Sequence, residues 1–510
     1  MLQILSTSNE TSTGAELVQN GNFSEIGSDL VTNGDFSAEG INLVDNPNFT
    51  DTGSELITNG DFATDTDWVK EGLWEISGGS ANRVAEGVNS RFYQVGVVEA
   101  LKSYKLTFTI SAISAGAINQ VTLGGVGISG TWNTAETFTL YFTTVNTASC
   151  SITGDATFAG SIDNVSVKEL GADWTLGTGW SIGDSKAIST LQSGSKYLTQ
   201  SSVVESGKSY KVSFEVIDYT SGSVKATVSG DEGEARTGIG TYTEILNATG
   251  TSFSIKNQSG LFIGSVSNIS VQELGEGWAV QDGWSIGEDK AICDGSTNNA
   301  ISQALSLPVG NIKVTFKVED FTSGDLNLWL NLPTFTNPLQ ADANGDYEVY
   351  VTTTSGANNL YFYSVAFIGS VTNITVQELD PNGYWTIGTG WSIGTDKAIS
   401  TVTGSNSDIT QSILTAGKTY RTVYEIVDYT AGTAQAIVTG SDGADAVALG
   451  TFTEDLTTTG TDFSIRSKLG TLNGAVSSVS VKLLGTYDDQ SIYVTAADVQ
   501  TIAQASVYYL

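Results

Sequence analysis

Apolar and polar residues alternate along most of this chain, in short stretches separated by glycine, asparagine and serine. In "SYKVSFEV", for example, Tyr210, Val212, Phe214 and Val216 occupy every second position. Side chains on a strand point alternately to its two faces, so these four residues would share one face. No segment has a convincing 3.6-residue apolar period, apart from a weak helix candidate at 496–505. The pattern predicts an all-β protein.

A large repeat divides most of the chain into four units. Trp74, Trp180, Trp284 and Trp391 recur at intervals of 104 to 107 residues, and each unit closes with a similar strand such as "IDNVSVKEL" or "VSNISVQEL". Units of this size can bury their own cores. We expect four tandem jelly-roll or β-sandwich modules at 54–170, 171–274, 275–379 and 380–484, followed by a C-terminal tail at 485–510. The linkers have only a few residues, which predicts a stiff rod.

A second, shorter repeat precedes the modules. The copies at 15–27, 28–40 and 41–53 contain "ELVQNGNF", "DLVTNGDF" and "NLVDNPNF", and a fourth, "ELITNGDF", leads into the first module. The apolar residues that recur every 13 positions before that module are Leu17, Phe23, Leu30, Phe36, Leu43 and Phe49. Thirteen residues cannot bury such side chains alone. We therefore predict an N-terminal anchoring arm at 1–53.

The sequence leaves several alternatives for the surface on which this arm packs. The copies could pack on each other as a short solenoid, on equivalent arms of an oligomer, or on a foreign surface by adding a strand to an exposed sheet edge. The remaining alternative is a tandem duplication that stays disordered.

The net charge of the chain excludes some classes of binding partner. It has 510 residues, with 22 Lys+Arg against 55 Asp+Glu, no histidine and a net charge of -33. Such a surface repels nucleic acid and anionic membranes, so we expect neither as a partner. The sequence contains no run of 18 apolar residues, so no membrane-spanning segment is expected. The first residues also lack the basic n-region of a secretory signal. Cys150 and Cys293 are expected to be core thiols.

The motifs together resemble a known group of modules. "ELITNGDF", then a tryptophan, a strand with glutamine, "KSYKLTF" and "IDNVSV" are similar to the jelly-roll carbohydrate-binding modules of families 4 and 9. Serial modules of this kind also resemble the virion appendage proteins of tailed bacteriophages. The second resemblance rests on the modular architecture and on the missing export signal.

Tryptophans are the first candidates for sugar contacts, because an indole face packs well on the CH groups of a sugar ring. Each module holds two tryptophans six positions apart, but residues present in every copy suit a shared core. Trp132 and Trp329 occur in one module each. We therefore take these two as the carbohydrate-binding candidates, with packing roles as the alternative.

Calcium is the second candidate ligand. The resemblance implies a structural Ca²⁺ between the opening and closing strands, held by oxygen ligands. Module 1 has Asn59, Asp61 and Asp163 at the matching positions, whereas Ser267 and Thr372 stand where Asp163 would lie in modules 2 and 3. A calcium site is thus expected in module 1 alone, and no other cofactor is expected. An Asn-Gly turn beside a solvated aspartate is the alternative.

Catalysis is not expected. A chain without histidine cannot form a Ser-His-Asp or Cys-His arrangement, and no pair of acids stands out as a glycosidase site.

The sequence therefore predicts a non-enzymatic structural protein of a phage virion, in a tail or capsid fibre or a decoration. Its arm would bind other virion proteins, its modules would face host-surface glycan, and fibre architecture implies a homo-oligomer, a trimer. The alternative is a bacterial cell-surface or extracellular carbohydrate-binding adhesin.

Overall fold

The computed structural model describes residues 12–190, 194–258, 261–331, 335–353, 359–401 and 404–485. In these ranges the chain is built almost entirely from β-strands, and the described helical residues are 3-10, as in the turn η2 (Lys468–Gly470). The all-β prediction is confirmed. None of the described helical segments is long or apolar enough to cross a membrane. The predicted tail at 485–510, with its helix candidate, lies outside the described residues except for Gly485.

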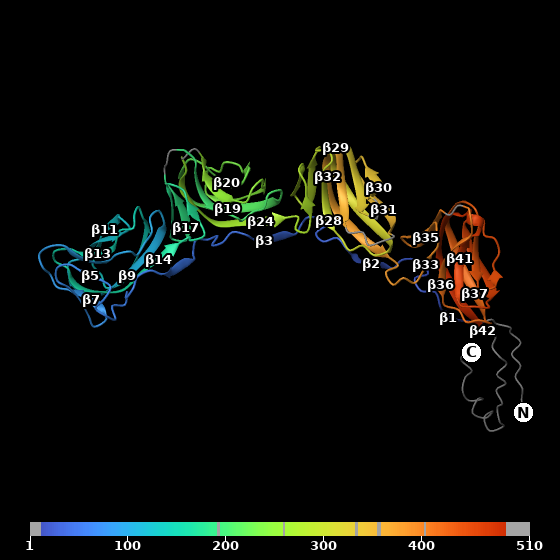
Figure 1. The fold of residues 1–510 in the computed structure, drawn as a ribbon, viewed down its shortest axis with the longest axis horizontal. Helices are drawn as coiled ribbons and strands as arrows, with labels where there is room; N and C mark the ends of the chain where they lie inside the picture. The colour runs from blue at the N-terminus through green and yellow to red at the C-terminus, as the bar shows by residue number, and fades with distance from the viewer. Residues whose placement is uncertain are drawn as a thin grey trace, which may run out of the picture.

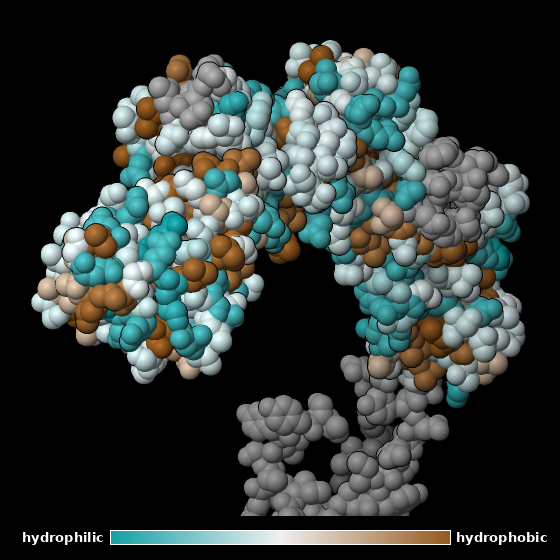
Figure 2. Space-filling view, turned by 60° about the vertical axis from the view of Figure 1, so that its left-hand side comes forward, coloured by the Kyte–Doolittle hydropathy of each residue, from teal (hydrophilic) through white to brown (hydrophobic). Residues whose placement is uncertain are grey.

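The four modules follow one another along an arc (Figure 1). Module 1 lies at the left of the view and module 4 at the right, and the turned view of Figure 2 shows the same curvature. The expected rod is therefore curved. Hydrophobic residues form separate patches among polar ones on the face that Figure 2 presents.

Module 1 contains two antiparallel sheets, ordered β11-β10-β13-β8-β5 and β12-β9-β14-β7-β6. Its strands are β5 (Val69–Lys70), β6 (Trp74–Ser77), β7 (Ser80–Arg83), β8 (Ser90–Gln94), β9 (Ser103–Ala115), β10 (Ile118–Leu123), β11 (Val126–Trp132), β12 (Thr137–Thr143), β13 (Cys150–Gly154) and β14 (Ala159–Leu170).

Module 2 repeats this plan, with sheets β15-β18-β23-β20-β21 and β16-β17-β24-β19-β22. Its strands are β15 (Thr175–Leu176), β16 (Trp180–Gly183), β17 (Lys186–Ser189), β18 (Lys196–Gln200), β19 (Ser209–Ser221), β20 (Val224–Val228), β21 (Asp231–Glu232), β22 (Gly240–Asn247), β23 (Phe253–Asn257) and β24 (Ile263–Leu274).

Module 3 differs because two very long strands, β29 and β32, each run through both layers and join them into one sheet. Its strands are β25 (Ala279–Val280), β26 (Trp284–Gly287), β27 (Lys290–Asp294), β28 (Ala300–Ala304), β29 (Gly310–Asn331), β30 (Phe335–Ala341), β31 (Gly345–Thr353) and β32 (Asn359–Leu379).

Module 4 returns to two sheets, β33-β36-β41-β38-β39 and β34-β35-β42-β37-β40. Its strands are β33 (Thr386–Ile387), β34 (Trp391–Gly394), β35 (Lys397–Thr401), β36 (Ser407–Ser412), β37 (Thr419–Ala431), β38 (Ala434–Val438), β39 (Ser441–Asp442), β40 (Gly450–Thr457), β41 (Asp462–Ser467) and β42 (Asn473–Gly485).

Each module encloses one apolar core, and the repeated tryptophan pair lies inside it. The buried pairs are Trp68/Trp74, Trp174/Trp180, Trp278/Trp284 and Trp385/Trp391. The expectation that these pairs belong to the core is confirmed. Cys150 and Cys293 are also buried and free, and burial raises the pKa of Cys150 to about 12, so its thiol is unreactive.

Neighbouring modules touch through a recurring hydrogen bond. The hydroxyl of Ser103 in module 1 accepts from the N–H of Ile182 in module 2 at 2.9 Å. The hydroxyl of Ser209 in module 2 accepts from Ile286 in module 3, also at 2.9 Å. These serines and backbone groups are buried, so each of these two junctions has a defined contact in addition to its short linker.

Candidate functional site

The N-terminal arm crosses all four modules and gives one strand to each. Its strands are β1 (Ser12–Glu16), β2 (Ile26–Asp29), β3 (Glu39–Asn42) and β4 (Thr52–Glu55). They pair in reverse order, β1 with β42 of module 4, β2 with β32 of module 3, β3 with β24 of module 2 and β4 with β14 of module 1. In Figure 1 the blue arm accordingly runs back along the arc beneath the modules.

The reason lies in the closing strand of each module. In module 4, β42 pairs along one side with β37, while β35 covers only its first four residues, Asn473 to Val476, on the other side. The second half of that side, Lys482 to Gly485, pairs with β1. Unpaired backbone groups along a sheet edge are unfavourable. The arm therefore completes a sheet that the module alone leaves half open, and the same division recurs in the other three modules.

Copy 1 (residues 15–27) illustrates the docking contacts. The N–H of Leu17 donates to the carbonyl of Val481 at 3.0 Å. The carboxylate of Glu16 accepts from the N–H of Val481 at 2.8 Å and from the N–H of Val18 at 3.0 Å. Glu16 thus ties the arm to the module through charge-assisted bonds. The corresponding side chains in copies 2, 3 and 4 are Asp29, Asn42 and Glu55.

A glutamine and a tryptophan of the module hold the turn that follows. The amide of Gln411 donates to the carbonyl of Gln19 at 2.7 Å and accepts from its N–H at 3.2 Å. The indole N–H of Trp385 donates to the carbonyl of Asn20 at 3.1 Å. The equivalent pairs in modules 3, 2 and 1 are Gln303 with Trp278, Gln200 with Trp174, and Gln94 with Trp68.

The Asn-Gly-x-Phe sequence of the repeat folds into a tight turn that delivers the phenylalanine. Asn20 and Phe23 both have positive φ, 47° and 57°, and the N–H of Phe23 donates to the carbonyl of Asn20 at 3.1 Å. Asparagine tolerates this conformation, but for phenylalanine it is uncommon. Burial of the ring against Trp385, with centroids 5.2 Å apart, compensates for that strain. Each of the other copies makes the same turn.

These contacts revise the prediction for the arm. The arm side chains do need another surface to pack on, but that surface is the chain's own modules rather than one of the alternatives considered. Phe23, Phe36 and Phe49 are fully buried there, whereas Leu17, Leu30 and Leu43 are half-buried. The deeper arm residues, which were not predicted, are the valines directly after each leucine, Val18, Val31 and Val44.

Each module thus has a docking groove for one copy, formed by its closing strand, its glutamine and its first tryptophan. The four docking grooves are not identical. The amide of Asn20 donates to the buried carboxylate of Asp380 at 2.9 Å, and Asp380 also accepts from the N–H of Trp385 at 2.9 Å. The corresponding amide nitrogens of Asn33 and Asn46 are buried without a hydrogen-bond partner. Module 4 therefore satisfies its copy more completely than modules 2 and 3 do.

Trp132 has a packing position. It ends β11, and its half-buried ring meets Phe108 edge-on, with centroids 5.9 Å apart. It also covers Gly130, where a Cβ would lie 2.7 Å from the ring. The ring thus has packing contacts, and sugar binding at Trp132 stays a prediction.

Trp329 lies on the opposite face of its strand from the buried Leu328 and Leu330. Its ring stacks on Tyr363 at 4.8 Å with planes 16° apart, and Tyr361 is its neighbour on β32. All three rings are half-buried. The tyrosines were not anticipated, although the alternation in "NLYFYSV" places both opposite the core residue Phe362. They form an outward-facing aromatic surface on module 3.

In module 2, a shallow hollow of about 480 Å³ lies on the sheet β15-β18-β23-β20-β21. Its lining combines Tyr197, a residue that is 42% exposed, with hydroxyl groups and the carboxylate of Glu232. The ammonium of Lys256 lies 5.6 Å from the Tyr197 ring. An aromatic ring beside hydroxyl and charged groups can make both apolar and polar contacts with a ligand.

The calcium candidates are already engaged in local turns. Asn59 accepts from the N–H of Thr64 at 3.2 Å, Asp61 accepts from the N–H of Ala63 at 3.3 Å, and Asp163 accepts from the N–H of Asn164 at 2.6 Å. Among the described residues no group of three Asp, Glu, Cys or His side chains could hold a metal. Calcium binding at Asn59, Asp61 and Asp163 stays a prediction.

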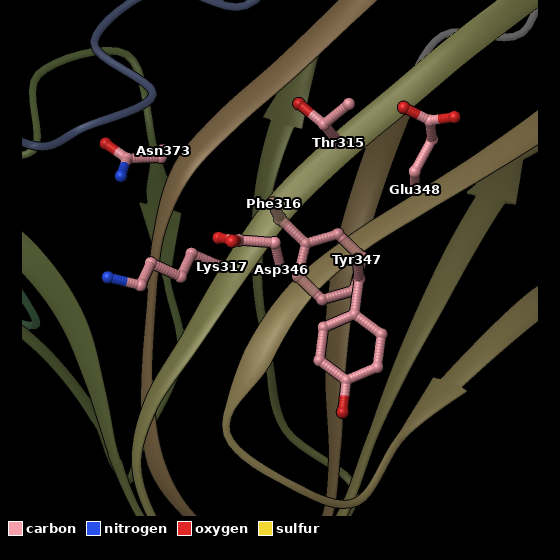
Figure 3. Close-up of a pocket in the computed structure, with 7 residues that line it drawn as sticks. All are labelled: Thr315, Phe316, Lys317, Asp346, Tyr347, Glu348 and Asn373. Atoms are coloured by element: carbon pink, nitrogen blue, oxygen red, sulfur yellow. The ribbon is translucent and has the colours of Figure 1, made fainter.

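A second hollow, of about 260 Å³, lies on module 3 between β29 and β31 (Figure 3). The charged ends of Lys317 and Glu348 point to opposite sides of this view. Each has its own ion partner, because Lys317 pairs with Glu319 at 2.6 Å and Glu348 with Lys313 at 2.7 Å. The Lys313 ammonium lowers the pKa of Glu348. An ionised, paired carboxylate of this kind is a poor general acid.

Comparison with known proteins leaves the family of the chain undefined. No protein-family model matches the sequence, and neither does any curated protein.

Solved structures show only distant likeness. The N-terminal CBM22 tandem of Paenibacillus barcinonensis Xyn10C aligns at 10% identity and a TM-score of 0.20, over 44% of this chain and 99% of that one. Saccharomyces cerevisiae allantoicase aligns at 9% identity and 0.18, over 38% and 80% of the two chains. Paenibacillus xanthan lyase aligns at 12% identity and 0.17, over 84% and 50%. Similarity at this level carries no argument about function.

Proposed function

We propose that this chain is a non-enzymatic structural protein, a curved spacer of four β-sandwich modules that projects from the surface of a particle. The observation that carries the proposal is the arm, which pairs with every module in turn. A continuous strap across all junctions resists bending and separation of the modules. A spacer needs this property, whereas an enzyme would not.

The absence of catalysis is part of the proposal. The two hollows described are shallow, and Lys317 and Glu348 in the module 3 hollow are held in ion pairs. Neither brings together an acid and a base around a space that a substrate could enter.

The particle we propose is the virion of a tailed bacteriophage, with the protein as a tail or capsid fibre or a decoration. The support is the serial architecture and the strongly acidic surface, with a net charge of -33, which keeps a protein soluble and away from nucleic acid. The expected trimer and the contacts with other virion proteins belong to this proposal. Attachment would then use surfaces other than the arm's Phe side chains, which are buried inside the modules.

Immunogold electron microscopy tests the location. Antibody against residues 171–484 should label phage-like particles from the source culture, and the position of the gold would separate head from tail. Label restricted to bacterial envelopes would contradict the virion and support a cell-surface adhesin.

The adhesin is the second candidate, and the aromatic surface of module 3 favours it. Stacked Trp329 and Tyr363 provide a flat face for a sugar ring, and the Tyr363 hydroxyl is already fixed by Asn298 at 2.6 Å. Glycan adhesion would serve a phage appendage as well. Retention of the full chain on immobilised host polysaccharide should fall in Trp329→Ala and persist in Trp132→Ala. Equal retention of both variants would remove the sugar-binding role of this surface.

A further inference from the structure

The docking grooves are binding sites for a short peptide motif. The hydrogen bonds described above between copy 1 and module 4 all come from one short stretch, Glu16 to Asn20. None of these contacts depends on the arm and the module belonging to the same chain. A copy offered by a second molecule would therefore make the same bonds, which is the condition for strand exchange between identical chains.

The groove of module 4 is the one best suited to such exchange. Copy 1 is the outermost described part of the arm, so it can leave without displacing copies 2 to 4. Copy 4 is in the opposite situation, because Phe62 packs on Trp68 only six positions later in the chain. This short connection and the docked β3 hold copy 4 at its own groove from both sides, whereas among the described residues copy 1 is held from one side, by β2 docked on module 3.

An empty groove in module 4 would be unfavourable. When copy 1 leaves, binding of another strand is therefore favoured over an unoccupied groove. Without copy 1, the backbone N–H groups of Val479 and Val481 lose their acceptors, and Trp385 loses the ring of Phe23. The exposed edge would then be a template for another strand.

The groove also has a specific partner for the asparagine of the repeat. Asp380 has φ of 54°, a conformation in which modules 2 and 3 have Gly171 and Gly275. Its carboxylate holds the Asn20 amide and the Trp385 N–H. Copy 1 of a second chain brings Asn20 into the same place.

We propose that the groove between β42 and Trp385 of module 4 is an exchangeable strand-binding site, and that its partner is copy 1 from the arm of a second molecule of this protein. Exchange of this outer copy links two molecules at their module 4 ends while modules 1 to 3 keep their own strands.

Disulfide trapping in full-length chains tests the proposal. A Cβ at Gly14 would lie 3.5 Å from the Cβ of Leu483, within the range that a disulfide spans. One chain carries Gly14→Cys and the other Leu483→Cys, so a covalent heterodimer forms only when copy 1 of one chain occupies module 4 of the other. The native Cys150 and Cys293 are buried and do not compete.

The matched control is the module 1 groove. A Cβ at Gly53 would also lie 3.5 Å from the Cβ of Glu169, so Gly53→Cys with Glu169→Cys has the same geometry on a tethered copy. We expect the module 4 pair to give at least about tenfold more heterodimer than the module 1 pair after incubation in a thiol redox buffer.

A doubly substituted chain, Gly14→Cys with Leu483→Cys, shows whether the cis geometry closes the bond. An internal disulfide there with no heterodimer from the mixed chains would overturn the proposal. Equal heterodimer yields at modules 4 and 1 would overturn it as well, because they would indicate random collision. Failure of the double variant to close its own bond would refute the docking geometry itself.

Discussion

The indole N–H of Trp385 donates a hydrogen bond to the backbone carbonyl of Asn20, 3.1 Å away and 365 positions earlier in the chain. Module 4 is thus completed by a segment that is synthesised long before it. Copy 1 cannot dock until the last module exists, and closing so long a loop slows folding. The reverse order lets docking begin with copy 4 beside module 1 and proceed along the arc.

Replacing one arm phenylalanine should loosen one module and leave the others intact. We expect Phe23→Ala to destabilise module 4 by about 3–5 kcal/mol, the usual cost of removing a buried phenylalanine ring. Hydrogen exchange with mass spectrometry should show lost protection in β42 and β37, with modules 1 to 3 unchanged.

The control for this variant is Ile41→Ala in the same arm, because Ile41 is 81% exposed and its loss should have little effect. Phe36→Ala should move the same loss of protection to module 3. Loss of protection in module 1 on changing Phe23 would contradict the reverse pairing.

The sequence predicts the modules well because each contains its own pattern. Alternating strands, the tryptophan pairs and the similar closing strands all lie within one repeat, and local periodicity is enough to read them. The destination of the arm could not be read in this way, since pairing between Leu17 and Val481 leaves no local trace in either segment.

One signal was nevertheless present. Modules 2, 3 and 4 lack the "NGDF" opening that module 1 has, and three spare copies of that opening stand in the arm. Three missing strands and three extra ones match in number. The aromatic surface of module 3 was predictable only in part. Trp329 was identified because no other module has it, whereas the pairing of β29 with β32 was needed to place Tyr361 and Tyr363 beside it.

The close approach of the arm to the closing strand can be tested at a glycine. A Cβ at Gly34 would lie 2.0 Å from the carbonyl oxygen of Ile374, so Gly34→Ala should push copy 2 away and destabilise module 3 by about 1–3 kcal/mol. At Gly27, in β2, which also pairs with module 3, the nearest atom is the Cβ of Glu378 at 3.4 Å. Gly27→Ala should therefore be much milder. Thermal unfolding of both variants would decide, and equal shifts would refute this close packing.

Acid should weaken module 1 through a buried ion pair. Arg83 and Glu86 pair at 2.8 Å with side-chain exposures of 0% and 10%. Hydrogen bonds from the Ser90 hydroxyl and the Arg83 guanidinium lower the pKa of Glu86. A carboxyl group with a lowered pKa in the folded state stabilises above its unfolded value of about 4.3, and that contribution is lost as the pH falls through the folded pKa.

The variant that tests this pair is Glu86→Gln, which leaves the buried guanidinium without its counter-charge. At pH 7 it should destabilise module 1 by about 3–5 kcal/mol, and the difference from wild type should shrink towards pH 3. Glu71→Gln is the matched control, because Glu71 and its partner Arg91 are each 45% exposed and such pairs contribute at most about 1 kcal/mol. Melting temperatures across this pH range would measure both. A Glu86→Gln deficit that does not change with pH would contradict the assignment.

The junction between modules 1 and 2 should depend jointly on a direct contact and on the arm. Ser103→Ala removes the acceptor for the buried N–H of Ile182, a loss of about 1–3 kcal/mol. The arm still bridges the junction, because copies 3 and 4 dock on the two modules, so small-angle X-ray scattering of this variant should resemble wild type. Phe49→Ala alone weakens copy 3 but keeps the serine contact. Only the double variant should broaden the distribution of intramolecular distances obtained from the scattering, as expected when two contacts are coupled. A clear change in either single variant would show that one contact alone sets the angle between the modules.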